Sequence, residues 1–203
     1  MLKSILLLFL LLTPITALAE EHEIRCKALI EFCPSCDYKK MITSIKEWQY
    51  PSSLNDYLIN ISPIRQEVEE LLESNGVSRF YLYLALAESG GVVDNLSEKS
   101  ARGLWQLMPY ISRHYGLTIN NKVDERLNYR KATETAARYI QRNLKAFDNN
   151  ALWCIAAYNA GGTNLKRLTG YTKGMPFSVV KQKSYRSYAL AITVIKMIYT
   201  AEC

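Results

Sequence analysis

Residues 80–91 read FYLYLALAESGG, and this stretch decides the fold. Eight apolar residues in succession leave no polar face, which predicts a helix over 80–87 that is buried on all sides. Glu88 follows this run and precedes a serine and two glycines. Burial raises the pKa of a carboxyl group because it penalises the charged form. Glu88 is therefore a candidate acid and base, although a single glutamate at a helix end is more often an ordinary solvated carboxylate.

The rest of the chain also shows helical periodicity, and no segment alternates apolar and polar residues as a strand does. A helix is predicted to start at Ser62-Pro63, with the serine as its cap, and to end at Asn75-Gly76. Further helices are predicted over 103–115, 130–147, 151–158 and 183–201, with loops over 91–100 and 169–179. The sequence therefore predicts an all-α protein.

The first 19 residues have the pattern of a secretory signal. Lys3 precedes an unbroken apolar run at 5–12, and Ala17 and Ala19 are small residues of the kind that a signal peptidase needs. An uncleaved membrane anchor fits less well, because the apolar run is short for a spanning helix. We expect cleavage after Ala19, a periplasmic or secreted chain, and an N-terminal extension over 20–61.

The chain is modestly basic. It has 25 Lys plus Arg against 19 Asp plus Glu, so removal of Lys3 with the signal leaves 24 against 19, a net charge of +5. That balance suits an anionic partner such as a charged glycan. The basic residues form no dense patch in the sequence, which argues against nucleic acid as a partner.

The five cysteines all follow the predicted signal. Cysteines of an exported chain can pair, and we expect structural disulfides among Cys26, Cys33, Cys36 and Cys203, with the connectivity open. Cys154 lies in an apolar helical stretch and is expected to be a buried free thiol.

Three segments beyond Glu88 contain residue types that bind sugars. They are GLWQLMP at 103–109, AAYNAGG at 156–162, and Tyr188 in the last predicted helix. Aromatic rings cover the apolar faces of sugars, and amide groups pair with hydroxyl and N-acetyl groups. Taken singly, Trp105 and Trp153 are more readily interpreted as core residues, because large aromatic side chains are usually buried.

In this order, Glu88-Ser89, GLWQLMP, AAYNAGG and Tyr188 resemble the catalytic domain of the soluble lytic transglycosylase superfamily. Within it, the sequence is most similar to the membrane-bound lytic murein transglycosylase D branch. The resemblance covers about residues 62–200. It implies a lysozyme-like all-α fold and a catalytic domain over 62–203, which follows the cysteine-containing extension.

The resemblance also implies roles for the matched residues. Glu88 would be the catalytic acid and base, and Tyr188 would support it by a hydrogen bond. No metal or cofactor is implied, and the sequence contains no metal-ligand spacing. The implied substrate-binding residues are Ser89, Gln106, Met108, Tyr158, Asn159 and Tyr188.

Most glycosidases use two carboxylates, whereas the matched motifs contain one. The resemblance implies that Glu88 protonates the β-1,4 oxygen between N-acetylmuramic acid and N-acetylglucosamine. Glu88 would then take a proton from the muramic C6 hydroxyl, which closes on C1 to give a 1,6-anhydro sugar. Such an intramolecular reaction has a large entropic advantage.

Two alternatives remain open at this point. The first is a hydrolytic muramidase on the same fold, in which Asp94 or Glu98 places a water molecule. The second is a protein that binds peptidoglycan strands without cleaving them. We expect a monomer in each case. Wall recycling and service to a secretion or conjugation apparatus are both compatible with the sequence.

Overall fold

The computed structural model describes residues 27–34, 36, 53–183 and 185–202. The predicted signal segment, Cys26 and Cys203 lie outside these residues. The described part of the chain is helical and contains isolated bridges, such as Leu96 with Arg102, but no β-strand. None of its helices is long and apolar enough to cross a membrane. The all-α prediction is confirmed.

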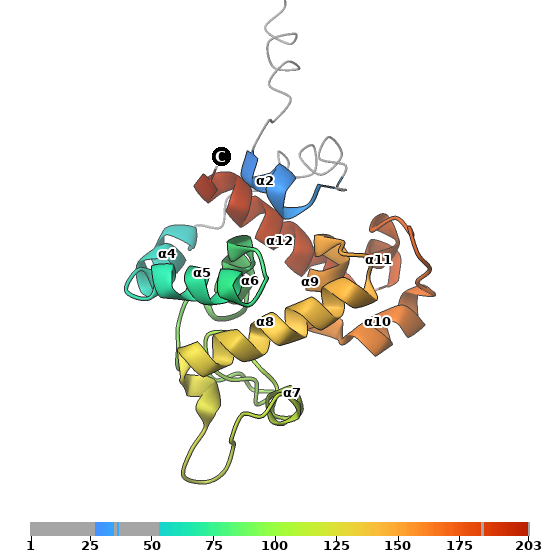
Figure 1. Ribbon diagram of the computed structural model, residues 1–203. Helices are drawn as coiled ribbons and strands as arrows, with labels where there is room; N and C mark the ends of the chain where they lie inside the picture. Colours follow the sequence, from blue (N-terminus) through green and yellow to red (C-terminus); the bar gives the residue numbers. More distant parts are fainter. Residues whose placement is uncertain (1–26, 35, 37–52, 184, 203) are drawn as a thin grey trace, which may run out of the picture.

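Helices of six to eighteen residues and two short 3₁₀ turns make up the fold (Figure 1). In chain order they are α2 (Lys27–Phe32), α4 (Leu54–Ile61), α5 (Arg65–Ser74), η1 (Arg79–Tyr81), α6 (Leu82–Ser89), α7 (Pro109–His114), η2 (Glu125–Leu127), α8 (Tyr129–Ala146), α9 (Ala151–Ala160), α10 (Gly162–Thr169), α11 (Ser178–Lys183) and α12 (Tyr185–Glu202).

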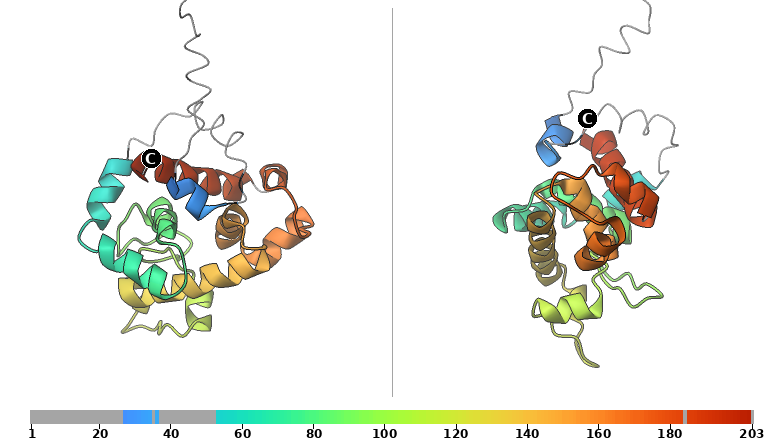
Figure 2. Two further views of the ribbon diagram at one scale, coloured as in Figure 1. Left: turned by 45° about the horizontal axis from the view of Figure 1, so that its top comes forward. Right: turned by 90° about the vertical axis from the view of Figure 1, so that its right-hand side faces the viewer.

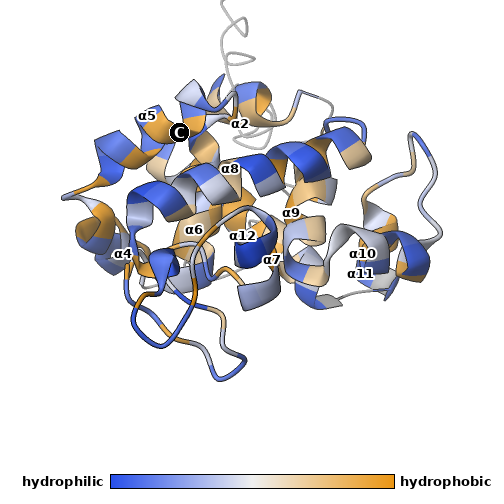
Figure 3. Cartoon of the chain, turned by 60° about the horizontal axis from the view of Figure 1, so that its bottom comes forward, coloured by the Kyte–Doolittle hydropathy of each residue, from blue (hydrophilic) through white to orange (hydrophobic). Residues whose placement is uncertain are grey.

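Helices α6 and α9 form the interior of the protein. Helix α9 packs against α8, α10 and α12, and α6 packs against α12 and α4. Both helices are apolar on nearly every side, so both can be enclosed without burying charge. Figure 3 shows them mainly in hydrophobic colours, whereas α8 carries hydrophilic and hydrophobic residues and has one buried face. The predicted helices over 80–87, 130–147 and 151–158 are thus confirmed to within a few residues.

Trp105 and Trp153 both belong to the core, with 0% and 1% of their surfaces exposed. Each indole N–H is paired inside the protein: Trp105 donates to the hydroxyl of Thr133 at 2.8 Å, and Trp153 donates to the carbonyl of Met175 at 3.0 Å. The interpretation of the two tryptophans as core residues is confirmed.

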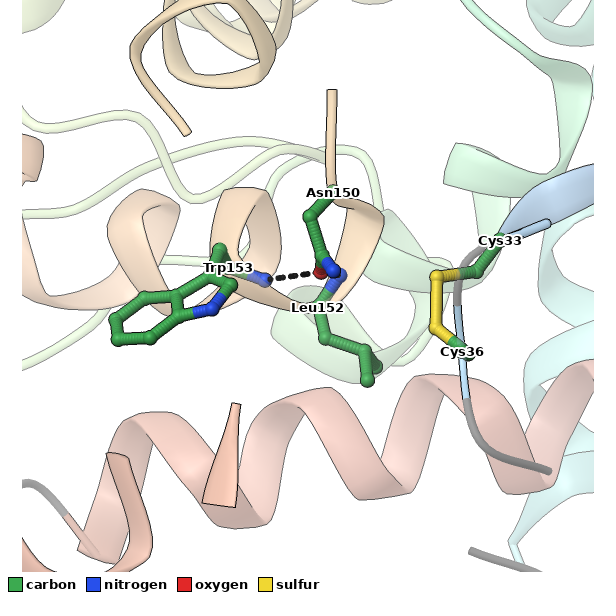
Figure 4. Close-up of a disulfide and its surroundings, with 5 residues drawn as sticks. All are labelled: Cys33, Cys36, Asn150, Leu152 and Trp153. Carbon is green, nitrogen blue, oxygen red and sulfur yellow. Dashed lines mark hydrogen bonds between the residues drawn. A yellow bond between two sulfur atoms is a disulfide. The ribbon is translucent and has the colours of Figure 1, made fainter. Parts of the chain in front are cut away.

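The described part of the N-terminal extension packs on the domain. Helix α2 lies against α12, at the opposite end of the molecule from α7 (Figure 2). A disulfide joins Cys33 to Cys36 beside the start of α9 (Figure 4). Cys154 is a buried free thiol. A disulfide among the expected cysteines and the free Cys154 are therefore confirmed.

The predicted helix start at Ser62 is wrong. Ser62 ends α4 in a helical conformation, and its hydroxyl donates to the carbonyl of Ile59 at 2.8 Å. An N-capping serine needs an extended backbone and a side-chain oxygen that faces the following turn. Helix α5 therefore begins later, at Arg65, and it ends at Asn75 and Gly76 as predicted.

The predicted helix over 103–115 is wrong in its first half. Only Pro109–His114 is helical, and the preceding residues form an irregular loop. Gly103 and Gln106 both have positive φ angles, 81° and 45°, which a right-handed helix excludes. Pro109 then starts α7 from the first helical position, where its missing N–H costs nothing.

Candidate functional site

Glu88 lies in the last turn of α6, where two glycines turn the chain. Gly90 adopts the left-handed conformation and donates its N–H to Leu86. A Cβ atom on Gly91 would lie 2.7 Å from the carbonyl oxygen of Tyr57, so the chain passes closer to α4 than any other residue would permit. These glycines end the helix at Ser89 and hold Glu88 at the rim of the core.

The carboxyl group of Glu88 is partly buried, and no described residue donates a hydrogen bond to it. Burial raises its pKa to about 7, and the positive charge of Arg186 on α12 opposes this rise. A group with this pKa is present in both protonation states near neutral pH, and it can give and take a proton at little cost.

The other two candidate carboxylates stand apart from Glu88. Asp94 and Glu98 lie exposed in the loop after α6. Within the described residues, the charge that acts on the Glu88 pKa is Arg186, and no carboxylate contributes. The structure therefore places one desolvated carboxyl at this site.

The loop over 91–108 is joined to α6 by polar side chains. The Ser89 hydroxyl donates to the Ala85 carbonyl at 3.0 Å and accepts the Gly91 N–H at 3.2 Å. Asn95 donates its amide to the Ser89 carbonyl at 3.3 Å. Gln106 donates its amide to the Asn95 carbonyl at 3.0 Å. Ser89 and Gln106 thus hold the backbone around Glu88.

Arg126 also fixes this loop, a role that none of the sequence motifs indicates. Its side chain is 6% exposed and donates to the carbonyls of Ser100 and Leu107 at 2.7 Å and 3.0 Å. Asp124 pairs with it through both carboxylate oxygens, at 2.9 Å and 2.7 Å. These partners lie 2 to 26 residues away along the chain, so no short motif indicates them.

Tyr158 and Asn159 lie at the C-terminal end of α9. The Tyr158 hydroxyl donates to the Trp105 carbonyl at 2.8 Å. Its pKa is raised well above the usual value, first by burial and then by the charge of Glu88, which places it near the candidate acid. Asn159 is exposed, and its side-chain oxygen accepts a hydrogen bond from the Ser187 hydroxyl on α12 at 3.0 Å.

Met108 and Tyr188 make none of the hydrogen bonds described above for the residues around Glu88. Met108 is partly buried and precedes α7. Tyr188 stacks on Phe177 with ring centroids 5.6 Å apart, and the Lys181 ammonium lies 5.7 Å from its ring. The expected hydrogen bond between Tyr188 and Glu88 is not formed between these two described residues. A supporting role of Tyr188 stays a prediction.

No group of three His, Cys, Asp or Glu residues in the described part of the chain lies close enough together to hold a metal ion. The polar groups that the structure ties to the Glu88 carboxyl are the charged Arg186 on α12 and the hydroxyl of Tyr158 on α9.

Comparison with known proteins identifies relatives of the chain. The chain is similar to the membrane-bound lytic murein transglycosylase D of Escherichia coli, with 29% identity over 110 residues, which are 54% of this chain and 24% of that protein. The protein of the same name from a second Escherichia coli strain gives the same values. The matched part thus spans about a quarter of the length of these relatives.

The family model described as the transglycosylase SLT domain matches residues 68–180, which is more than half of the chain. The matched segment contains Glu88, the loop with Gln106, and the end of α9 with Tyr158 and Asn159. Of these residues, Tyr158 lies near enough to Glu88 for the charge of that carboxyl to raise its pKa. With its all-α, lysozyme-like fold, the chain belongs to the transglycosylase SLT domain family.

Proposed function

We propose that this chain is a peptidoglycan lytic transglycosylase. It cleaves the β-1,4 bond between N-acetylmuramic acid and N-acetylglucosamine and leaves 1,6-anhydromuramic ends. The observation that carries this proposal is the partly buried Glu88 carboxyl, which has a pKa of about 7 and no hydrogen-bond donor among the described residues. Family membership and the names of the relatives, which are murein transglycosylases, support the substrate class.

The proposed reaction uses Glu88 twice. The protonated carboxyl donates its proton to the glycosidic oxygen, and the bond from that oxygen to C1 of the muramic residue breaks. The carboxylate then accepts the proton of the muramic C6 hydroxyl, whose oxygen bonds to C1. Glu88 ends in its starting protonation state, and no water is consumed. Arg186 favours the carboxylate form, which is the product of the first step.

We prefer intramolecular closure over hydrolysis because, among the described residues, Glu88 is the one carboxyl at the site. A hydrolytic enzyme of the usual kind needs a second carboxylate to activate water or to act as the nucleophile. Asp94 and Glu98 are exposed and exert no effect on the pKa of Glu88. Holding the C6 hydroxyl next to C1 gives the substrate its own nucleophile.

The site residues divide into two groups in this proposal. Ser89, Gln106 and Tyr158 bind the protein backbone through their side chains, so they would position the walls and also line the glycan cleft. Asn159, Met108 and Tyr188 would contact the glycan more directly. Export to the periplasm or beyond is part of the proposal, because peptidoglycan lies there.

The test compares the unmodified protein with Glu88→Gln on purified peptidoglycan, with product masses determined by mass spectrometry. The unmodified protein should release fragments one water lighter than reducing-end fragments. Glu88→Gln should release none while still unfolding in a single cooperative thermal transition. Asp94→Asn and Glu98→Gln serve as matched controls and should retain cleavage.

Each alternative function gives a different result in the same experiment. Fragments with ordinary reducing ends would identify a hydrolytic muramidase. Binding to peptidoglycan without release of fragments would identify a silent binding protein. Release at a normal rate by Glu88→Gln would overturn the assignment of the catalytic residue.

A further inference from the structure

A groove of about 550 Å³ is lined by residues of α7, the C-terminal half of α8 and the start of α10. Its lining includes Gly161 and Gly162, which follow Tyr158 and Asn159 directly in the chain. Tyr139 also lines it, and its ring lies 5.1 Å from the ring of Tyr158. The groove therefore adjoins the site around Glu88. None of the residues described above as positioning that carboxyl lines it.

The walls of the groove are positively charged. Arg142 and Lys166 both line it, and the lining contains no acidic residue. Neither side chain makes an ion pair with a described residue. The Lys166 ammonium instead lies 5.1 Å from the ring of Phe147 and 5.5 Å from the ring of Tyr171. Aromatic faces hold a cation without neutralising it, so the charge of Lys166 remains available to a ligand. The charge of Arg142 is available as well.

The start of α10 adds donors to this surface. Gly162, Thr163 and Asn164 form its first turn and line the groove, and no side chain caps that turn. The first N–H groups of a helix have no partner within the helix, and they carry the positive end of its dipole. A Cβ atom on Gly161 would meet nothing within 4 Å, so a ligand has room to approach the backbone here.

Asn143 supplies an independent sign that the groove is a binding site. Its side chain lines the groove and is 2% exposed, and its amide nitrogen has no partner within hydrogen-bonding distance. The amide faces Tyr139, another lining residue, closely enough to lower the pKa of that hydroxyl. Its side-chain oxygen lies 3.4 Å from the position that a Cβ on Gly162 would occupy, directly under the first turn of α10. An unpaired buried amide costs stability, and such groups in native proteins call for an explanation.

We infer that this groove binds a carboxylate of the substrate, through Arg142, Lys166 and the start of α10. In peptidoglycan that carboxylate comes either from a peptide stem or from the lactyl group of a muramic residue whose stem has been removed. The chain would then recognise the acidic substituents of the glycan as well as its sugars. The identity of the substrate in this inference rests on the proposed function.

The test measures binding, so it does not depend on cleavage. Calorimetry is carried out on the chain carrying Glu88→Gln, which prevents turnover of the ligand. Three soluble glycan strands are compared: strands with peptide stems, strands freed of stems by an amidase, and freed strands whose carboxyls have been converted to neutral amides. The groove variant is Arg142→Gln with Lys166→Gln.

The matched control is Arg138→Gln with Lys145→Gln, which removes the same charge from exposed positions on α8 outside the groove. The groove variant should bind carboxylate-bearing strands roughly five- to tenfold more weakly, with a smaller difference at high salt. The control should bind them as the parent does. Arg142→Lys with Lys166→Arg keeps both charges and should restore most of the affinity.

The ligands distinguish the two sources of the carboxylate. Weaker binding of stem-bearing strands alone identifies the stem, and weaker binding of the amidase-treated strands identifies the lactyl group. Equal weakening on the neutral strands, no weakening on any strand, or a parent that binds no carboxylate-bearing strand would overturn the inference. Absence of cleavage by the unmodified protein would overturn the proposed function and leave this binding result standing.

Discussion

The Tyr158 hydroxyl donates a hydrogen bond to the carbonyl oxygen of Trp105 at 2.8 Å, which joins α9 to the loop over 91–108. Both residues are buried, with exposed fractions of 9% and 0%. The polar end of Tyr158 is thus already occupied by the protein backbone. The residue acts on the site through the position of the loop.

Tyr158→Phe should test this arrangement. Loss of the hydroxyl leaves the Trp105 carbonyl without this donor, so we expect the free energy of unfolding to fall by about 1–2 kcal/mol. Cleavage should weaken mainly through a higher KM, because the loop loses a fixed point. Tyr199→Phe, which removes a tyrosine hydroxyl from α12, is the control. Unchanged stability with a large loss of kcat would show instead that the hydroxyl contacts substrate.

Gly103→Ala should be among the most damaging small substitutions in the chain. A Cβ atom at this position would lie 2.1 Å from the Arg126 carbonyl oxygen, and the backbone has a φ of 81°. The loop must move, so we expect a loss of more than about 3 kcal/mol in unfolding free energy together with loss of cleavage. Denaturant unfolding measures the first effect.

Gly116→Ala separates steric overlap from backbone strain. Gly116 has a φ of 94°, but a Cβ atom there would meet nothing within 4 Å. Only the cost of a left-handed conformation applies, about 1–2 kcal/mol. Equal losses for the two alanine variants would contradict the close approach between Gly103 and Arg126.

The buried helices were predictable from sequence because their pattern is local. Residues 80–87 and 151–158 are apolar on every side, and only enclosure can accommodate such segments. Glu88 could be singled out for the same reason, because a carboxyl at the end of an apolar run is desolvated wherever the run is buried.

The loop before α7 was not predictable in this way, because long-range contacts determine it. Its apolar and aromatic residues fit a helical pattern, but Gln106 has a positive φ and Arg126 binds two of the loop's carbonyls. Asn143 is similar: its place under Gly162 depends on how α8 meets α10. Spacing along the chain records neither relationship.

Arg126→Gln tests the role of these long-range contacts. The substitution leaves the Asp124 carboxylate and the carbonyls of Ser100 and Leu107 short of donors in a buried place. Breaking a buried ion pair by removing one partner typically costs about 3–5 kcal/mol, and we expect a loss in this range by denaturant unfolding. Cleavage should fall at temperatures where the variant is still folded, since the loop that holds Gln106 loosens.

Arg130→Gln is the matched control for Arg126→Gln. Arg130 is exposed and pairs with Glu67 on the surface, where solvent screens the interaction. We expect little change in unfolding and none in cleavage. A similar effect of both arginine substitutions would show that general loss of charge, not the buried contacts, is responsible.

The raised pKa of Glu88 predicts how activity and stability depend on pH. Its pKa is about 7 in the folded chain against an ordinary value of 4.5, so the folded state binds the proton more tightly than the unfolded state. This contribution to stability is fully present below pH 4.5 and is lost as the pH rises through 7. Because a shift of one unit corresponds to 1.36 kcal/mol, the loss is at most about 3–4 kcal/mol. Cleavage should also decline above pH 7, since the protonated form donates the first proton.

Glu88→Gln cannot ionise, so it should unfold at higher denaturant concentration than the parent at about pH 8 and at a similar one at about pH 4. Unfolding curves of the two proteins across this pH range measure the difference, and parallel pH profiles would show that Glu88 is not desolvated.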